Sequence, residues 1–365
     1  MNVCDLALPS INAIKPYQPG KPIEELEREL GISNIIKLAS NENPLGPSQL
    51  ALAAIAQASK ELTRYPDGNG FVLKAVLADY YQLMPEQVTL GNGSNDVLEL
   101  LARAFVSPAD EVIFSQYAFA VYPLVTQAIG AKAVIAASRD FGHDLDAMAA
   151  LISDKTKLIF IANPNNPTGT SIAPEKIEVF LKRVPESVIV VLDEAYVEYT
   201  MQTINTLDWL KNFPNLVISR TFSKAYGLAA LRVGYSLSSP DIADLLNRIR
   251  QPFNVNSLAL AAAAATLTDK TYLVLTRQTN AEGLKQFEAR FEQLGLNYIP
   301  STANFITVDV QTNADAVYQS LLQQGVIVRP IANYGLQQHL RISVGLTAQN
   351  QRCLDALTIA LELSV

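Results

Sequence analysis

Seven short apolar runs alternate with helical patterns over residues 87–238, and this alternation constrains the fold more than any other feature. The runs span residues 87–90, 111–114, 133–136, 158–162, 188–192, 217–219 and 233–237. Several are apolar throughout, as strands buried on both faces of a sheet are. Helical patterns lie between them, at 95–105, at 173–183 and around Trp209. The pattern predicts an α/β fold with an open, mostly parallel sheet covered by helices.

The pattern changes after residue 251. Long helices are expected over 257–295, followed by short strands and helices at 304–310, 314–324, 326–329, 340–344 and 348–363. The first forty residues contain four prolines and one helical pattern at 23–30, which predicts an arm and a helix. We therefore expect a large domain over 41–268, and a smaller α/β domain built from 1–40 and 269–365.

Composition argues against several classes of protein. The net charge is −7 without any basic run, which disfavours nucleic acid as a partner. Two cysteines are too few for a disulfide framework and indicate a reducing compartment, the cytoplasm. No basic segment precedes the short apolar stretch at the N-terminus, so no signal peptide is predicted. The longest run of small apolar residues, 258–267, falls short of the roughly 20 residues that span a bilayer.

The small number of histidines argues against two kinds of catalytic site. The chain has two histidines, His143 and His339, and no HExxH pattern, so no metal site is predicted. A Ser-His-Asp hydrolase would need one of these two histidines, and no G-x-S-x-G turn accompanies either.

Polar clusters follow three of the predicted strands. They are the segment Asn163-Pro164-Asn165-Asn166-Pro167-Thr168-Gly169, the segment Asp193-Glu194-Ala195-Tyr196, and the pair Ser223-Lys224. Taken singly, these are common turns, helix caps or solvated lysines. Because ligands bind beyond the carboxyl ends of parallel strands, the three clusters together predict one site.

The surroundings of Lys224 indicate a particular cofactor. Ser223 precedes it, Arg232 follows, and Asp193 ends an earlier apolar run. Pyridoxal phosphate has an aldehyde for a lysine, a phosphate for a hydroxyl and an arginine, and a ring nitrogen for an aspartate. The sequence therefore predicts a pyridoxal phosphate site around Lys224.

A second candidate phosphate site is the turn Gly91-Asn92-Gly93-Ser94-Asn95-Asp96, which follows a strand and opens a helix. Backbone N–H groups at a helix N-terminus bind phosphate. The turn begins like a dinucleotide-binding motif, but Asp96 occupies the place of the third glycine. An ordinary glycine turn with a helix cap is the simplest alternative.

The chain resembles the fold-type-I aminotransferases that use pyridoxal phosphate, over nearly its whole length. The resemblance is carried by the block Lys37–Ser48, Arg64-Tyr65-Pro66-Asp67-Gly68, the NPNNPTG segment, residues 223–235, Tyr334-Gly335-Leu336 and residues 340–345. It implies a homodimer with shared active sites, and transamination between L-histidinol phosphate and 2-oxoglutarate.

The resemblance also implies roles for cofactor-binding residues. Lys224 would form the Schiff base and move protons, Asp193 would hold the ring nitrogen, and Asn166 and Tyr196 would contact a ring oxygen. Tyr117 would stack on the ring. The phosphate would be held by the residues Gly93, Ser94, Asn95, Thr221, Ser223 and Arg232, and by Tyr65 from the other subunit.

Substrate binding is implied for four further residues. Arg329 and Arg341 would take either a carboxylate or a phosphate, Tyr17 would close over the substrate, and Asn43 would line the site. Two departures from the family pattern bear on this set: Gln337 follows Tyr-Gly-Leu where a proline is frequent, and Ser115-Gln116-Tyr117 lacks a proline.

Four alternatives stay open. Two use the same cofactor, an aromatic amino-acid aminotransferase and a decarboxylase of a phosphorylated amino acid. A nicotinamide-dependent oxidoreductase would use the glycine turn at 91–96, but leaves the Lys224 set unexplained. A non-catalytic regulator on this fold would normally carry a basic, helix-rich DNA-binding extension, and the sequence has none.

Overall fold

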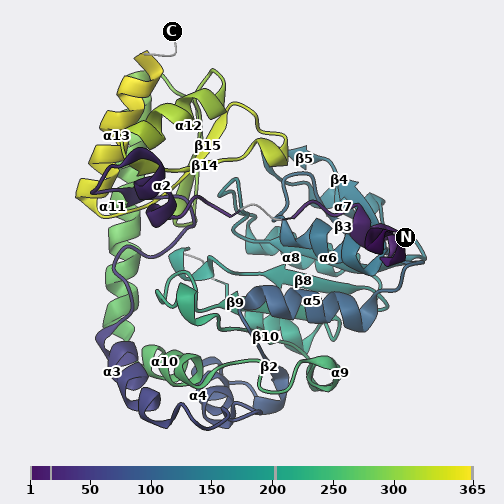
Figure 1. The fold of residues 1–365 in the computed structure, drawn as a ribbon. Coiled ribbons are helices and arrows are strands. Elements are labelled where there is room, and N and C mark those ends of the chain that lie inside the picture. Colours follow the sequence, from purple (N-terminus) through teal and green to yellow (C-terminus); the bar gives the residue numbers. More distant parts are fainter. Residues whose placement is uncertain (1, 17–18, 201–203, 363–365) are drawn as a thin grey trace.

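A seven-stranded sheet forms the centre of the larger part of the molecule (Figure 1). The computed structural model describes residues 2–16, 19–200 and 204–362. In sheet order the strands are β2 (Val88–Gly91), β10 (Gly234–Leu237), β9 (Leu216–Thr221), β8 (Ile189–Asp193), β7 (Thr156–Ala162), β3 (Glu111–Ser115) and β4 (Lys132–Ala136). Only β10 runs antiparallel to its neighbours, so the predicted mostly parallel sheet is confirmed.

Both faces of this sheet are covered, which explains its apolar strands. In β3, Ile113 belongs to the hydrophobic cluster on one face, while its neighbours Val112 and Phe114 belong to the cluster on the other. The first cluster also takes side chains from α8 (Pro174–Leu181) and α10 (Ser257–Thr266). The second takes side chains from α5 (Ser94–Phe105), α6 (Val121–Ile129) and α9 (Pro240–Ile249).

The rest of the larger part surrounds this frame. It includes α3 (Gln49–Ala58), α4 (Phe71–Tyr81), α7 (Leu145–Ala150) and the hairpin of β5 (Ser138–Arg139) and β6 (Gly142–His143). The predicted helix around Trp209 is a 3₁₀ helix, η5 (Thr206–Lys211). Pro214 lies just beyond it, and the residue before a proline disfavours α-helical backbone, so the segment stays short.

The smaller part has a hydrophobic core of its own. Its sheet has the order β11 (Tyr298–Ile299), β12 (Phe305–Asp309), β15 (His339–Ser343) and β14 (Arg329–Pro330), and all its pairs are antiparallel. Its helices are α11 (Lys270–Leu294), α12 (Ala314–Gln323) and α13 (Thr347–Glu362). They share a core that includes Phe287, Ile306 and Leu340. The hydrophobic cores of the two parts are thus separate, as expected for two domains. The exact domain boundaries stay a prediction.

From α2 onward the N-terminal segment joins this smaller part, whereas α1 (Pro9–Asn12) lies against α6 of the larger part. After η1 (Val3–Leu6) and α1 (Pro9–Asn12), the predicted helix is present as α2 (Ile23–Leu30), whose Leu26 is fully buried beside Ile327. The strand β1 (Ile36–Lys37) then pairs in parallel with β13 (Val326–Ile327). The chain therefore enters the larger part from the small one, through residues 38–48.

Within the described residues, no single helix is long and apolar enough to cross a membrane. The pair α10 and α11 reaches that length and composition only across an 84° bend.

Candidate active site

The carboxyl ends of β7, β8 and β9 meet the N-terminus of α5 at one cavity, as the sheet reading predicted. The residues Ala39, Ser40 and Asn41, together with Arg341 in β15, close it from the side of the smaller part. The lining residues are Gly20, Ala39, Ser40, Asn41, Ser94, Asn95, Phe119, Ala162, Pro164, Asn166, Asp193, Ala195, Tyr196, Thr221, Ser223, Lys224, Arg232, Arg329, Tyr334 and Arg341.

Lys224 follows β9 and reaches into the middle of this cavity. Its Nζ donates a hydrogen bond to the carbonyl oxygen of Ser40 at 3.1 Å and lies 5.8 Å from the centre of the Tyr196 ring. Burial, helped by the positive charge of Arg341, lowers the pKa of Lys224 to about 8. A lysine with a lowered pKa has more neutral amine at neutral pH, the form that attacks carbonyl carbon and accepts protons.

Asp193 ends β8 beneath the cavity, with 4 % of its surface exposed. Its Oδ2 accepts a hydrogen bond from the hydroxyl of Tyr122 at 2.8 Å, while its Oδ1 is buried without a hydrogen-bond partner in the described structure. Burial raises the pKa of Asp193 to about 6, against the lowering effect of the Tyr122 hydrogen bond. A buried carboxylate oxygen without a donor fits a cationic N–H group of a ligand.

The hydroxyl of Tyr196 is held by two amides. Asn41 Nδ2 donates to it at 3.0 Å and Asn166 Nδ2 at 3.3 Å. Asn166 comes from the NPNNPTG segment, in which the bonds before Pro164 and Pro167 are both cis. Burial raises the pKa of Tyr196 to about 12, so its hydroxyl stays protonated at neutral pH.

The N-terminus of α5 forms a candidate anion site. Gly93 has a φ of 79°, and a Cβ there would lie 2.3 Å from Nη2 of Arg232, so only glycine allows the arginine this close. Arg232 Nη1 donates to Ser223 Oγ at 3.2 Å. Ser94 begins the helix and lines the cavity beside them. Backbone N–H groups, a hydroxyl and a guanidinium together suit a phosphate.

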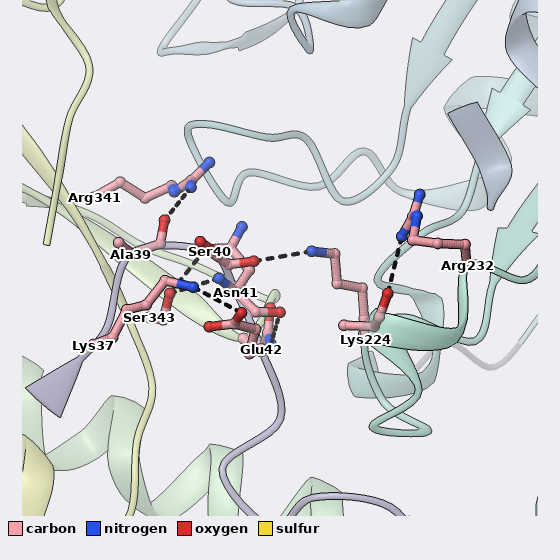
Figure 2. A network of polar contacts seen from close by, with 11 residues as sticks. Lys37, Ala39, Ser40, Asn41, Glu42, Lys224, Arg232, Arg341 and Ser343 are labelled. Atoms are coloured by element: carbon pink, nitrogen blue, oxygen red, sulfur yellow. Dashed lines mark hydrogen bonds and ion pairs between the residues drawn. The ribbon is translucent and has the colours of Figure 1, made fainter. Parts of the chain in front are cut away.

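Arg341, in β15, reaches the cavity from the smaller part (Figure 2). It is buried, and its two Nη atoms donate to Asn166 Oδ1 at 2.5 Å and to the carbonyl oxygen of Ala39 at 2.8 Å. Its guanidinium lies 5.4 Å from the ring centre of Phe305. Arg329 also lines the cavity, from β14 next to β15. Both predicted substrate arginines therefore face Lys224 from one sheet.

Three predicted residues lie elsewhere in the structure. Tyr117 is outside the cavity lining, with its ring 5.9 Å from Phe141. Asn43 is buried, and its amide donates to Ala225, Tyr272 and Thr276 rather than lining the cavity. Tyr65 is 82 % exposed. The predicted Tyr17 lies outside the described residues.

Several residues of the site were not predicted from the sequence, and four of them are side chains with a clear place in it. Tyr122 contacts Asp193 from inside α6, Asn41 contacts Tyr196, and Phe119 and Tyr334 line the cavity. Tyr122 lies one helical turn past the predicted Tyr117 segment, and its position in a helix core gave no sign of a polar role. Tyr334 was recognised as part of a family segment, without a role.

The comparisons with known proteins define the class. A model of the aminotransferase class I and II family matches residues 33–357, so the chain belongs to this class. Curated relatives narrow it further. A histidinol-phosphate aminotransferase 2 of Pseudomonas fluorescens (strain Pf0-1) is 58% identical over 98% of this chain and 97% of its own length. One of Pasteurella multocida is 57% identical over 100% of both chains. The chain is a member of the histidinol-phosphate aminotransferase family.

Solved structures agree with this. The histidinol-phosphate aminotransferase of Sinorhizobium meliloti, solved in complex with pyridoxal-5'-phosphate, has a TM-score of 0.91 and 30% identity, covering 98% of each chain. A Thermus thermophilus aspartate aminotransferase variant shares the fold, with a TM-score of 0.84 at 21% identity. The predicted fold class and cofactor are thereby confirmed.

The cavity fits pyridoxal phosphate on its own chemistry. The unpartnered Oδ1 of Asp193 matches a protonated ring nitrogen, the Ser94–Arg232 site matches a phosphate, and the Lys224 amine matches an aldehyde. The individual roles of these residues stay predictions.

Burial of Asp193 predicts a pH effect on the cofactor-free protein. Because its folded pKa of about 6 exceeds the ordinary 3.8, the folded state binds more protons between these values, and stability falls as the pH rises through them. Urea unfolding should show the protein losing roughly 2 kcal/mol relative to Asp193→Asn as the pH rises from about 4 to about 7. If the free energy of unfolding changed with pH in the same way for both proteins, burial of Asp193 would not carry the cost assigned to it.

Proposed function

We propose that this chain is a cytoplasmic, homodimeric enzyme that transaminates L-histidinol phosphate with 2-oxoglutarate. The products are imidazole acetol phosphate and glutamate. The observation that carries the proposal is the arrangement of charge around one amine. Lys224 lies between Arg232 on one side and Arg341 on the other (Figure 2), and both arginines lower its pKa. Such a cavity takes a cofactor phosphate at one end and a substrate anion at the other.

The cofactor side is supplied by the larger part of the chain. Pyridoxal phosphate, when bound, supplies an electron sink for negative charge that develops at the substrate carbon bearing the amine. The α5 N-terminus, Ser223 and Arg232 would hold its phosphate. Asp193 would keep its ring nitrogen protonated, and the protonated Tyr196 would donate to a ring oxygen.

Lys224 is the residue we assign to proton transfer. Its neutral amine can accept a proton from the substrate carbon and return it to another carbon, because a pKa of about 8 lies close to neutral pH. The hydrogen bond from Nζ to the Ser40 carbonyl holds the amine in the cavity.

The substrate side is supplied by β14 and β15. Histidinol phosphate offers a phosphate at this end, and 2-oxoglutarate offers a carboxylate. Arg341 and Arg329 can bind either anion, because guanidinium groups bind both phosphate and carboxylate through paired N–H groups. The hydrogen bonds from Arg341 to Asn166 and Ala39 keep its guanidinium in place until an anion arrives.

The homodimer is supported by the surface near Tyr65. Tyr65 is 82 % exposed and stacks on Phe253, with ring centres 4.8 Å apart. Leu62, Phe71 and Val72 nearby in sequence are also exposed. A group of exposed apolar residues is typical of a protein–protein interface. If a second copy of the chain binds here, Tyr65 would lie at the active site of that second subunit. Sedimentation equilibrium should give twice the mass of one chain.

Product analysis tests the reaction directly. The holoenzyme, incubated with histidinol phosphate and 2-oxoglutarate, should form glutamate and the ketone in equal amounts, and release no CO₂. Release of CO₂ with consumption of a phosphorylated amino acid would instead identify the decarboxylase alternative.

The arginine assignment makes a further prediction. Arg341→Lys keeps a charge but loses the paired N–H geometry, and a hydrogen bond to a charged group contributes about 1.5–3 kcal/mol. We expect kcat/KM to fall roughly 10- to 150-fold for histidinol phosphate and for 2-oxoglutarate alike. Single-turnover measurements of the two half-reactions check this. A loss confined to one of them would contradict a shared anion site.

A further inference from the structure

Residues 38–42 bring a backbone turn against three functional side chains at once. Arg341 donates to the carbonyl oxygen of Ala39, and Lys224 donates to that of Ser40. The side chain of the next residue, Asn41, donates to the Tyr196 hydroxyl. Figure 2 shows the turn between Arg341 and Lys224. The position of this turn therefore affects how each of these groups is presented to the cavity.

Asn41 is held in an uncommon conformation by the smaller part. Its φ is 56°, in the left-handed region that asparagine tolerates better than most residues. Its N–H donates to Ser343 Oγ at 2.8 Å, and Ser343 Oγ donates to Asn41 Oδ1 at 3.1 Å. Asn304 Nδ2 donates to its carbonyl oxygen at 2.9 Å. These three residues are all nearly fully buried.

The Ser343 contact fixes which end of the Asn41 amide faces Tyr196. Ser343 Oγ accepts a hydrogen bond from the backbone N–H of Asn41. The hydroxyl hydrogen of Ser343 is therefore donated to Asn41 Oδ1. The Nδ2 end is thereby left for Tyr196. With Asn166 as a second donor, the Tyr196 oxygen receives two N–H groups. Its own hydrogen must then point in a third direction, away from both amides.

We propose that Asn41, oriented by Ser343, is a positioning residue that makes Tyr196 a hydrogen-bond donor into the cavity. The inference rests on the proposed function, because the acceptor that Tyr196 meets is an oxygen of the bound cofactor. Charged and titratable groups facing Tyr196 come from several elements: Arg341 in β15, Asp193 in β8, Lys224 after β9 and Tyr334 in η7 (Ala332–Tyr334). The amides of Asn41 and Asn166 donate to the tyrosine oxygen at 3.0 Å and 3.3 Å.

The substitution Asn41→Asp tests this with almost no change in shape. A carboxylate in place of the amide accepts the Tyr196 proton instead of donating, so the tyrosine no longer donates into the cavity. Donation to the cofactor oxygen favours its anionic form, and therefore keeps the pH midpoint of the cofactor's visible absorbance low. We expect Asn41→Asp to raise this midpoint by about one pH unit or more. Ser343→Ala, which frees the amide to turn over, should raise it by less.

Asn350→Asp is the matched control. Asn350 is another fully buried asparagine, and its side chain hydrogen-bonds to the backbone of Gly345, just past β15. Its substitution should lower the melting temperature and leave the absorbance midpoint unchanged. Asn41→Gly removes the side-chain amide without backbone strain, because glycine readily adopts a positive φ. This variant should also raise the absorbance midpoint.

The possible outcomes separate the two proposals. A midpoint in Asn41→Asp equal to that of Asn350→Asp would overturn the role of Asn41 and leave the proposed reaction standing. A wild-type protein that shows no visible absorbance after incubation with pyridoxal phosphate would contradict the proposed function itself.

Discussion

Replacing Lys224 by alanine should lower kcat by at least about 10⁴-fold, because we assign both the covalent attachment and the proton transfer to this one side chain. Among the described residues that line the cavity, Lys224 is the only lysine. Its amine is already neutral in part at neutral pH, and no neighbouring group of the cavity combines a nucleophile with a base at that position. Steady-state assays with histidinol phosphate and 2-oxoglutarate measure the loss.

Two variants sharpen the Lys224 test. Lys224→Arg keeps the positive charge but has no neutral amine, so it should be as inactive as the alanine variant. Lys182→Gln is the matched control, because Lys182 forms an ion pair with Glu178 at 2.7 Å on the surface, at the end of α8. Exposed pairs contribute little, so its activity should stay near that of the wild type. Turnover by Lys224→Ala at a rate close to that of Lys182→Gln would refute the assignment.

Asp193→Asn should give the second-largest loss, about 10²- to 10⁴-fold in kcat. The substitution keeps the size of the side chain but removes the charge that faces the cavity through Oδ1. Leaving a buried partner charge uncompensated costs about 3–5 kcal/mol, which sets this range. The holoenzyme should also lose its cofactor more readily on dialysis, a readout that does not depend on the substrate.

Tyr122→Phe separates the charge of Asp193 from its positioning. The variant keeps the carboxylate but loses the 2.8 Å hydrogen bond to Oδ2, which is a loss of about 0.5–1.5 kcal/mol. Activity should fall only about 2- to 12-fold. If Tyr122→Phe and Asp193→Asn lowered kcat equally, the negative charge of Asp193 would not be what supports turnover.

The fold was predictable because its signals are local. The strands of the seven-stranded sheet are short and largely apolar, and Lys224, Asp193 and Asn166 lie at or within four residues of the ends of three of them. Parallel strands carry such residues to one edge, so their meeting in a cavity followed from the pattern alone. Boundaries moved by only a residue or two, as at β8.

The remaining parts of the site depend on contacts between distant positions. Asn41 and Ser343 are 302 residues apart in the chain, and no local pattern indicates that they meet. Asn43 and Asn41 are alike in sequence, yet Asn43 turns toward α11 and Asn41 toward Tyr196. The left-handed backbone at Asn41 decides this difference, and it arises from packing against the smaller part.

The most direct test of the proposed function is a comparison of amino donors. The purified holoenzyme is given 2-oxoglutarate with histidinol phosphate or with phenylalanine, and kcat/KM is measured for each donor by glutamate formation. The proposal predicts a clearly higher kcat/KM for histidinol phosphate, since its phosphate binds Arg341 and Arg329 with two negative charges where phenylalanine offers one. A higher value for phenylalanine would contradict the proposal and identify the aromatic aminotransferase alternative.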